Sequence, residues 1–285
     1  MSRRRRLTIA AALQLYIADR AAIVAAPERL HQTTRQLVPV LGKYLIDRRL
    51  THRVRTYIES RRQDGVQNPT IRRELVTLRA AIRLAWREGH ISAAPPFPLP
   101  PNNPGRHRAL SRHEIRRLIT AARSDDQVRL FIVLAMATGA RRGAILELTW
   151  DRVNFGMRQI DFRAPHPRAA RRKNRAVVPM DIRLRRILHA ARGLREANQR
   201  VITLDATALR RRLNAVAARA QIAGPITPHL FRHTAATELL RRVPLVIASR
   251  MIGHRSVAIT EQVYGHLTVG DLAAGARSLA RFAGL

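Results

Sequence analysis

Three short clusters between residues 138 and 264 contain side chains that can act on a phosphate group. Arg141 follows Thr-Gly-Ala, and His229 and Arg232 are three residues apart, a spacing that puts them on one face of a helix. His254 belongs to a Gly-His pair and precedes Tyr264 by ten residues. Tyrosine can act as a nucleophile, arginine can bind phosphate oxygens through two N–H groups, and histidine can transfer protons. Such a set can supply what metal-free cleavage of a phosphodiester requires.

The composition of the chain determines how strongly each residue of these clusters supports a functional motif. All but two of the 53 basic residues are arginine, so an arginine in any single motif is weak evidence. Histidine (11) and tyrosine (4) are much scarcer. The two histidines and the tyrosine therefore carry most of the information in the three clusters.

Taken together and in this order, the clusters resemble the tyrosine recombinase (phage integrase) family. The family pattern is an Arg after Thr-Gly-x, a His-x-x-Arg, a Gly-His and a terminal Tyr, and this chain has TGAR, HLFR, GH and Tyr264. The resemblance covers nearly the whole chain. The first half is similar to the core-binding domain of the family, and residues 109–285 are similar to its catalytic domain.

The resemblance implies a role for each residue of the pattern. Tyr264 would attack the scissile phosphorus, giving a 3′-phosphotyrosyl link and a free 5′-hydroxyl, and rejoining would need no ATP. Arg141 and Arg232 would bind the phosphate oxygens and neutralise the developing charge. His229 and His254 would position the phosphate and assist proton transfer. We expect no cofactor and no metal.

The family also carries a lysine on a β-hairpin, which protonates the departing 5′-oxygen. Lys173 is one of two lysines in the chain and falls on the second arm of a predicted hairpin. Arginine gives up its proton poorly, whereas lysine beside a phosphate can do so. Two alternatives stay open: Lys173 is one more phosphate contact, or Arg171 or Arg172 takes the aligned position.

Two departures from the family pattern affect the expected activity. The family usually has an acidic residue three places after the first arginine, and this chain has Ala144 there. Glu147, one turn further along, is not expected to reach as a substitute, so we expect a slower enzyme.

The interval from His254 to Tyr264 is one residue longer than in many relatives. The pattern of residues 269–285 predicts a short amphipathic helix, and the resemblance implies that it would dock on a neighbouring protomer.

Ordinary structural roles compete with several of these assignments. A helical histidine such as His229 is often a core residue, and Tyr264 by itself could be a packing aromatic. Trp86 and Trp150 are expected in the core. Arg142 is expected to point away from its neighbour because adjacent helical residues face different directions.

The net charge of +34, present in both halves of the chain, indicates a polyanionic partner. Aromatic residues are only 4%, which argues against stacking on single strands and favours duplex DNA bound through its phosphates. A ribosomal or nucleoid protein would share this charge. The sequence has no cysteine and no long apolar run, so we expect a cytoplasmic, nucleoid-associated protein without membrane contact.

Several arginines are candidate DNA contacts. One group recurs at helical spacing before residue 88 and the other surrounds Lys173. The candidate contacts are Arg72, Arg73, Arg79, Arg83, Arg171, Arg172 and Arg175, with Arg87 on the same helical face as the first group.

Hydrophobic periodicity predicts a mainly α protein with a small helical domain and a larger, mixed α domain containing a small antiparallel β-sheet or hairpin. The resemblance implies that the first is the core-binding domain and the second the catalytic domain. Asn68-Pro69-Thr70 marks a helix start, and Ser111 with Glu114 forms a capping box. The predicted helices of the first half are near 7–24, 31–49, 52–63 and 69–89, the hairpin arms are 158–162 and 174–180, and the domains are 1–93 (core-binding), 94–108 (Pro-rich linker) and 109–285 (catalytic).

The resemblance therefore implies a site-specific recombinase that acts on double-stranded DNA as a homotetramer on paired sites, with exchange of the C-terminal helix between protomers. One alternative is a type IB topoisomerase-like enzyme, which relaxes DNA as a monomer. The other is a DNA-binding or architectural protein of the same fold whose catalysis has weakened, with Ala144 as the first sign.

Overall fold

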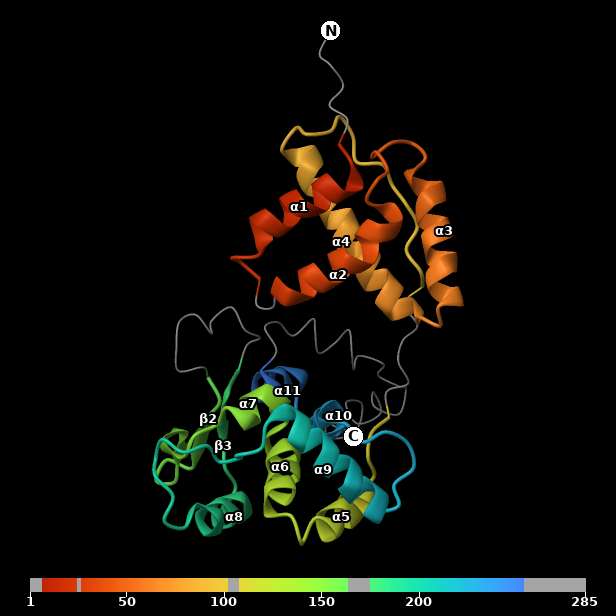
Figure 1. Cartoon of the computed structure of the whole chain (residues 1–285). Coiled ribbons are helices and arrows are strands. Elements are labelled where there is room, and N and C mark those ends of the chain that lie inside the picture. Colours follow the sequence, from red (N-terminus) through yellow and green to blue (C-terminus); the bar gives the residue numbers. More distant parts are fainter. Residues whose placement is uncertain (1–6, 25–26, 102–107, 164–174, 254–285) are drawn as a thin grey trace, which may run out of the picture. The chain divides into compact units, whose positions relative to one another are not determined.

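The computed structural model describes residues 7–24, 27–101, 108–163 and 175–253. The chain divides into two compact units, Met1–Arg106 and His107–Leu285 (Figure 1). Helices dominate both units, and the second also contains a small sheet. This is the predicted fold class.

The described part of the first unit contains four helices around one apolar core. They are α1 (Ile9–Arg20), α2 (Pro27–Leu41), α3 (Leu50–Gln63) and α4 (Asn68–Arg87). On α4 the buried residues Ile71, Leu75, Leu78 and Ile82 repeat at helical spacing, and this stripe packs against α1 and α2. The helix at 31–49 was predicted too long, because the chain turns after Leu41. A side-chain carbon at Gly42 would lie 2.6 Å from the Val38 carbonyl oxygen, so glycine permits this turn.

The proline-rich residues after α4 pack against the helices of the first unit. Phe97 is buried in the core, and the Thr51 hydroxyl donates to the Pro96 carbonyl at 2.9 Å. Arg79 donates to the Phe97 carbonyl at 2.6 Å, and Arg72 donates to the Pro100 carbonyl at 2.7 Å. Side chains bind the carbonyls of a segment whose prolines have no N–H to build regular structure. The first residues of the expected 94–108 linker therefore lie on α3 and α4.

A buried carboxylate joins α3 to α4. The Glu74 side chain accepts from the Tyr57 hydroxyl at 2.8 Å and from Arg61 at 2.9 Å. Burial, together with the hydrogen bond to Glu74, raises the pKa of Tyr57 far above its ordinary value. The phenol therefore stays a donor to the carboxylate, and the pairing with Arg61 compensates the cost of burying the acid.

The second unit is built around α6 (Asp126–Thr138), whose residues Phe131, Ile132 and Leu134 are buried. Phe131 meets Phe231 edge to face, with ring centroids 6.4 Å apart. The other described helices are α5 (Arg112–Ala121), α7 (Arg142–Leu146), a 3-10 turn at Trp150–Arg152, α8 (Ile182–Arg192), α9 (Ala206–Arg219), α10 (Pro228–Leu240) and α11 (Leu245–Ile252).

The described sheet has three antiparallel strands in the order β1 (Val153–Asn154), β2 (Gln159–Asp161) and β3 (Val177–Pro179). Ile160 pairs with Val178 and also with Val153, and all three side chains are buried. Strands β2 and β3 confirm the two predicted hairpin arms. β1 was not predicted, since two residues are too few to show an alternating pattern.

Among the residues that the structure describes, no helix is both long and apolar enough to cross a bilayer.

Candidate active site

Arg232 connects α10 to the turn that follows α6. This turn is formed by Gly139, which ends α6 in the left-handed conformation with φ of 62°. The Arg232 guanidinium donates to the Gly139 carbonyl at 2.8 Å, and the residue is only 5% exposed. α10 itself begins at a side-chain cap from Thr227, followed by Pro228. The Thr-Gly-Ala-Arg and His-x-x-Arg clusters of the sequence are therefore neighbours in space.

Arg141 makes a similar contact on the other side of this turn. It has an extended backbone immediately before α7, and its guanidinium donates to the carbonyl of Gly253 at 3.1 Å. Gly253 ends α11 in the left-handed conformation. Burial, and then repulsion from Arg175, lowers the pKa of Arg141 from its ordinary value. Arg141 is thus held beside the residue that precedes His254 in the sequence.

Arg141 and Arg232 line the same small cavity, and Arg175 lines it with them. Arg175 lies just before β3, and its guanidinium donates to Glu147 at 2.8 Å. The rest of the lining is mainly apolar, including the buried Ala144. The Glu147 carboxylate thus contacts a cavity-lining arginine from one turn after the place where the family carries its acid. That Glu147 does not substitute for that acid stays a prediction.

His229 is exposed on the first turn of α10, which excludes the core role that was its alternative. Its ring lies beside His233, with centroids 5.3 Å apart and an interplanar angle of 59°. His229 and Arg232 share the helix at the predicted spacing, the first exposed and the second buried. Arg142 is exposed while Arg141 is partly buried, so the two point in different directions as expected.

The remaining predicted site residues lie outside the described part of the chain. They are Lys173, Arg171, Arg172, His254 and Tyr264, together with the C-terminal segment 269–285. The site that can be described therefore consists of the three arginines at one cavity, Glu147 behind Arg175, and His229 on the helix that carries Arg232.

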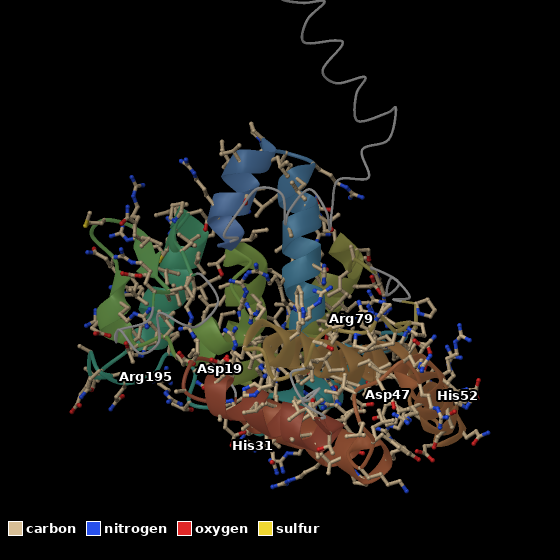
Figure 2. All side chains as sticks on the ribbon, turned by 90° about the horizontal axis from the view of Figure 1, so that it is seen from above. Asp19, His31, Asp47, His52, Arg79 and Arg195 are labelled. Atoms are coloured by element: carbon tan, nitrogen blue, oxygen red, sulfur yellow. The ribbon has the colours of Figure 1, made fainter. Side chains whose placement is uncertain are left out.

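The predicted basic face of α4 holds two kinds of arginine. Arg73 and Arg83 are exposed, whereas Arg72 and Arg79 are partly buried by their contacts with the proline-rich segment (Figure 2 labels Arg79). Burial, followed by repulsion from Arg83 and Arg72, lowers the pKa of Arg79.

Next to these residues, α1 and α4 form a groove of about 600 Å³. Tyr16 and Arg20 line it from α1, and Val76 and Trp86 line it from α4 with several arginines. Trp86 is 50% exposed, so its expected place in the core was wrong, whereas Trp150 is buried as expected.

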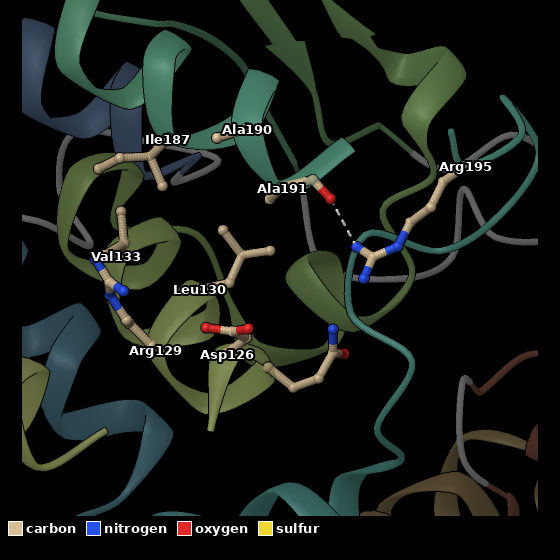
Figure 3. A pocket seen from close by; sticks show the side chains of 9 residues that line it. Asp126, Arg129, Leu130, Val133, Ile187, Ala190, Ala191 and Arg195 are labelled. Atoms are coloured by element: carbon tan, nitrogen blue, oxygen red, sulfur yellow. Dashed lines mark hydrogen bonds between the residues drawn. The ribbon is translucent and has the colours of Figure 1, made fainter. Parts of the chain in front are cut away.

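A second hollow of about 400 Å³ lies between α6 and α8 (Figure 3). Leu130, Val133 and Ile187 form an apolar wall, and Arg195 donates to the Ala191 carbonyl at 2.9 Å. Its lining shares no residue with the arginine cavity. The described residues of its lining include one carboxylate, Asp126, and no histidine, lysine, serine or tyrosine, so it presents no pair of nucleophile and base.

Over the described ranges, no group of three or more His, Asp or Glu side chains is placed to hold a metal ion. The chain has no cysteine.

The chain belongs to the phage integrase family, whose sequence profile matches residues 108–270, more than half of the chain. The matched region begins just before α5 and includes Arg141, His229, Arg232, His254 and Tyr264.

Proteins similar to this chain carry related names. Tyrosine recombinase XerC of Alcanivorax borkumensis is 25% identical over 254 residues, which cover 82% of this chain and 80% of that protein. A tyrosine recombinase of Agathobacter rectalis is 43% identical over 67 residues, or 23% of this chain and 22% of that protein.

Solved structures share the fold at low identity. The Tn1549 transposon integrase in complex with transposon right-end DNA matches with a TM-score of 0.80 at 18% identity, covering 96% of this chain and 100% of that one. A lambda integrase tetramer bound to a Holliday junction matches with a TM-score of 0.72 at 18% identity, covering 90% and 77%.

Proposed function

We propose that the protein is a site-specific DNA recombinase that cuts and rejoins duplex DNA through a covalent bond to Tyr264. The observation that carries the proposal is the convergence of Arg141 and Arg232 on one cavity, beside the glycine that leads into His254. Two guanidinium groups fixed at one point suit a phosphate better than a neutral substrate. Membership of the phage integrase family supports the same reaction.

In the proposed reaction the Tyr264 oxygen attacks the scissile phosphorus, forming a 3′-phosphotyrosyl bond while the bond to the 5′-oxygen breaks. Lys173 gives a proton to the departing 5′-oxygen, and His229 and His254 assist proton transfer at the tyrosine. Arg141 and Arg232 stabilise the charge on the phosphate oxygens. A 5′-hydroxyl then attacks the phosphotyrosyl bond and restores the diester, so neither ATP nor a metal is consumed.

The proposed partner is double-stranded DNA. The DNA contacts are the exposed arginines of α4 with Arg72 and Arg79 beside them, and the group Arg171, Arg172 and Arg175 around the hairpin. Lambda integrase binds a Holliday junction as a tetramer. We propose a homotetramer on paired sites here as well, with residues 269–285 exchanged between protomers, in a cytoplasmic, nucleoid-associated protein.

The decisive experiment uses a nicked suicide DNA substrate, on which the cleaved strand diffuses away and traps the covalent complex. The wild-type protein is expected to give an adduct that survives a denaturing gel, and Tyr264→Phe is expected to give none while binding the same DNA. An adduct formed by Tyr264→Phe would contradict the assignment of the nucleophile.

The same assay separates the alternatives. Tight, salt-sensitive binding without an adduct on the protein's own recombination site would favour a DNA-binding protein of this fold. Relaxation of supercoiled plasmid without site preference would favour a topoisomerase-like enzyme.

A further inference from the structure

We infer that Arg175, held by Glu147, is a third arginine of the phosphate site and contacts a non-bridging oxygen of the scissile phosphate. This inference rests on the proposed function and adds a residue to its site. The role is electrostatic and differs from the proton donation proposed for Lys173.

The first argument is placement. Arg175 lines the cavity that Arg141 and Arg232 also line, although the three residues come from the hairpin, from the start of α7 and from α10. Repulsion from Arg175 contributes to the lowered pKa of Arg141, which means that the two positive charges act on each other. Three cations around one small space create a strong local preference for an anion.

The second argument is an unused donor. The Arg175 side chain is only 10% exposed, and its Nη2 group donates to Glu147. Its Nη1 group is buried and has no hydrogen-bond partner among the described residues. A buried donor without a partner is costly, whereas a phosphate oxygen would satisfy it with a charge-assisted bond.

The third argument explains Glu147. Arg141 and Glu147 flank the two ends of α7, so this short helix fixes the distance between them, with Ala144 in the middle. A carboxylate at Glu147 lies a turn beyond the usual position of the acid, and it contacts the cavity through the long side chain of Arg175. Glu147 is therefore a positioning residue: it turns the planar guanidinium so that one nitrogen is bound and the other is presented.

The test compares two substrates in single-turnover cleavage. One is the ordinary suicide substrate, and the other carries a methylphosphonate at the scissile position, in which a neutral methyl group replaces one charged oxygen. If Arg175 binds that oxygen, Arg175→Ala should slow cleavage of the ordinary substrate by about 100-fold, the usual effect of removing one donor to a developing oxyanion. On one of the two methylphosphonate isomers the loss should nearly disappear.

Four further variants make the result specific. Arg175→Lys keeps the charge but not the fork, so it should recover only part of the rate. Glu147→Gln should slow cleavage by about 10-fold, and the double variant with Arg175→Ala should be no slower than Arg175→Ala alone, because both act on one contact. Arg212→Ala is the control: it removes an arginine that is paired with Asp125 away from the cavity, and it should cleave at the wild-type rate.

The outcomes separate the two claims. An adduct with wild type, together with equal losses for Arg175→Ala on the diester and on both methylphosphonate isomers, would show a merely structural role and overturn the inference alone. If the two substitutions slow cleavage additively in the double variant, Glu147 does not act through Arg175, and its positioning role is contradicted. If the wild-type protein forms no adduct on its own site, the proposed function fails and the inference falls with it.

Discussion

Arg141 and Arg232 are held by the same kind of contact, although they belong to different parts of the second unit. Each donates to the carbonyl of a glycine that ends a helix with positive φ: Arg232 to Gly139 and Arg141 to Gly253. A guanidinium carries five N–H donors, so one carbonyl contact orients it without using all of them. The carbonyls of Gly139 and Gly253 therefore help to orient the two guanidinium groups.

Substitution of Gly139 tests this role. Its φ of 62° disfavours any side chain, and a side-chain carbon would lie 3.0 Å from the Ile252 side chain on α11. We expect Gly139→Ala to lower the free energy of unfolding by about 1–2 kcal/mol and to slow cleavage further by displacing the carbonyl that holds Arg232. Gly65→Ala is the control for backbone strain, because φ is 76° there and nothing lies near. A smaller loss at Gly139 than at Gly65 in denaturant unfolding would contradict the crowding argument.

Lys173, also at the residue scale, can be tested as the general acid that protonates the departing 5′-oxygen by comparing two leaving groups. Lys173→Ala should cleave an ordinary diester about 100-fold more slowly, the usual range for loss of a general acid. A substrate with a 5′-bridging sulfur has a leaving group that needs no proton, so the variant should cleave it almost as fast as wild type. Equal slowing on both substrates would move the acid to another residue, with Arg171 and Arg172 as the next to test.

At the scale of elements, α5 shows how a short motif fixes the start of a helix. Ser111 accepts from the Glu114 backbone and Glu114 accepts from the Ser111 backbone, as the capping box predicted. Glu114 also pairs with Arg108. The backbone hydrogen bond from Ser111 is the main cause that lowers the pKa of Glu114 below its ordinary value near 4.5.

The sign of this shift gives a pH dependence. The ionised Glu114 favours the folded state, so its contribution is fully present above about pH 4.5 and is lost as the pH falls through the lower, folded-state pKa. We expect Glu114→Gln to lower stability at neutral pH and to reduce the loss of stability below pH 4.5, measured by thermal unfolding at several pH values. Glu196→Gln, an exposed carboxylate, is the control. If the melting temperatures of wild type and Glu114→Gln fall equally steeply below pH 4.5, the assignment to Glu114 is contradicted.

At the scale of the whole molecule, the charge of +34 makes salt dependence the first property to measure. An arginine that contacts a phosphate displaces counterions from the DNA, and log affinity therefore falls as log salt concentration rises. Removing one such arginine should make this negative slope shallower by about 1. We expect this from Arg83→Ala, with little change in melting temperature, because Arg83 is exposed.

The matched variant for that experiment is Arg72→Ala. Arg72 donates to the Pro100 carbonyl, so its removal should lower the stability of the first unit, because it releases the proline-rich segment. A fall in melting temperature for Arg83→Ala as large as for Arg72→Ala would show that the exposed arginine is structural. An unchanged salt slope for Arg83→Ala would remove it from the DNA contacts.

Local patterns predicted most of the secondary structure. The start of α4 at Asn68, the cap of α5 and the two hairpin arms depend on neighbouring residues and on the periods of helices and strands, which are visible in one dimension. The turn after Leu41 was missed because it depends on the close approach of Gly42 to Val38, which no period reveals.

The sequence by itself determined the residue types and the spacing of the candidate site: Tyr264 after His254, and His229 with Arg232 on one helix. Such spacings are properties of the chain and need no knowledge of packing. Only the tertiary structure decided that Glu147 pairs with Arg175, 28 residues away, that Arg72 and Arg79 bind carbonyls of the proline-rich segment, and that Trp86 is exposed. The reason is physical: these contacts join residues that are distant along the chain, and the folding of the whole unit alone brings them within hydrogen-bonding distance.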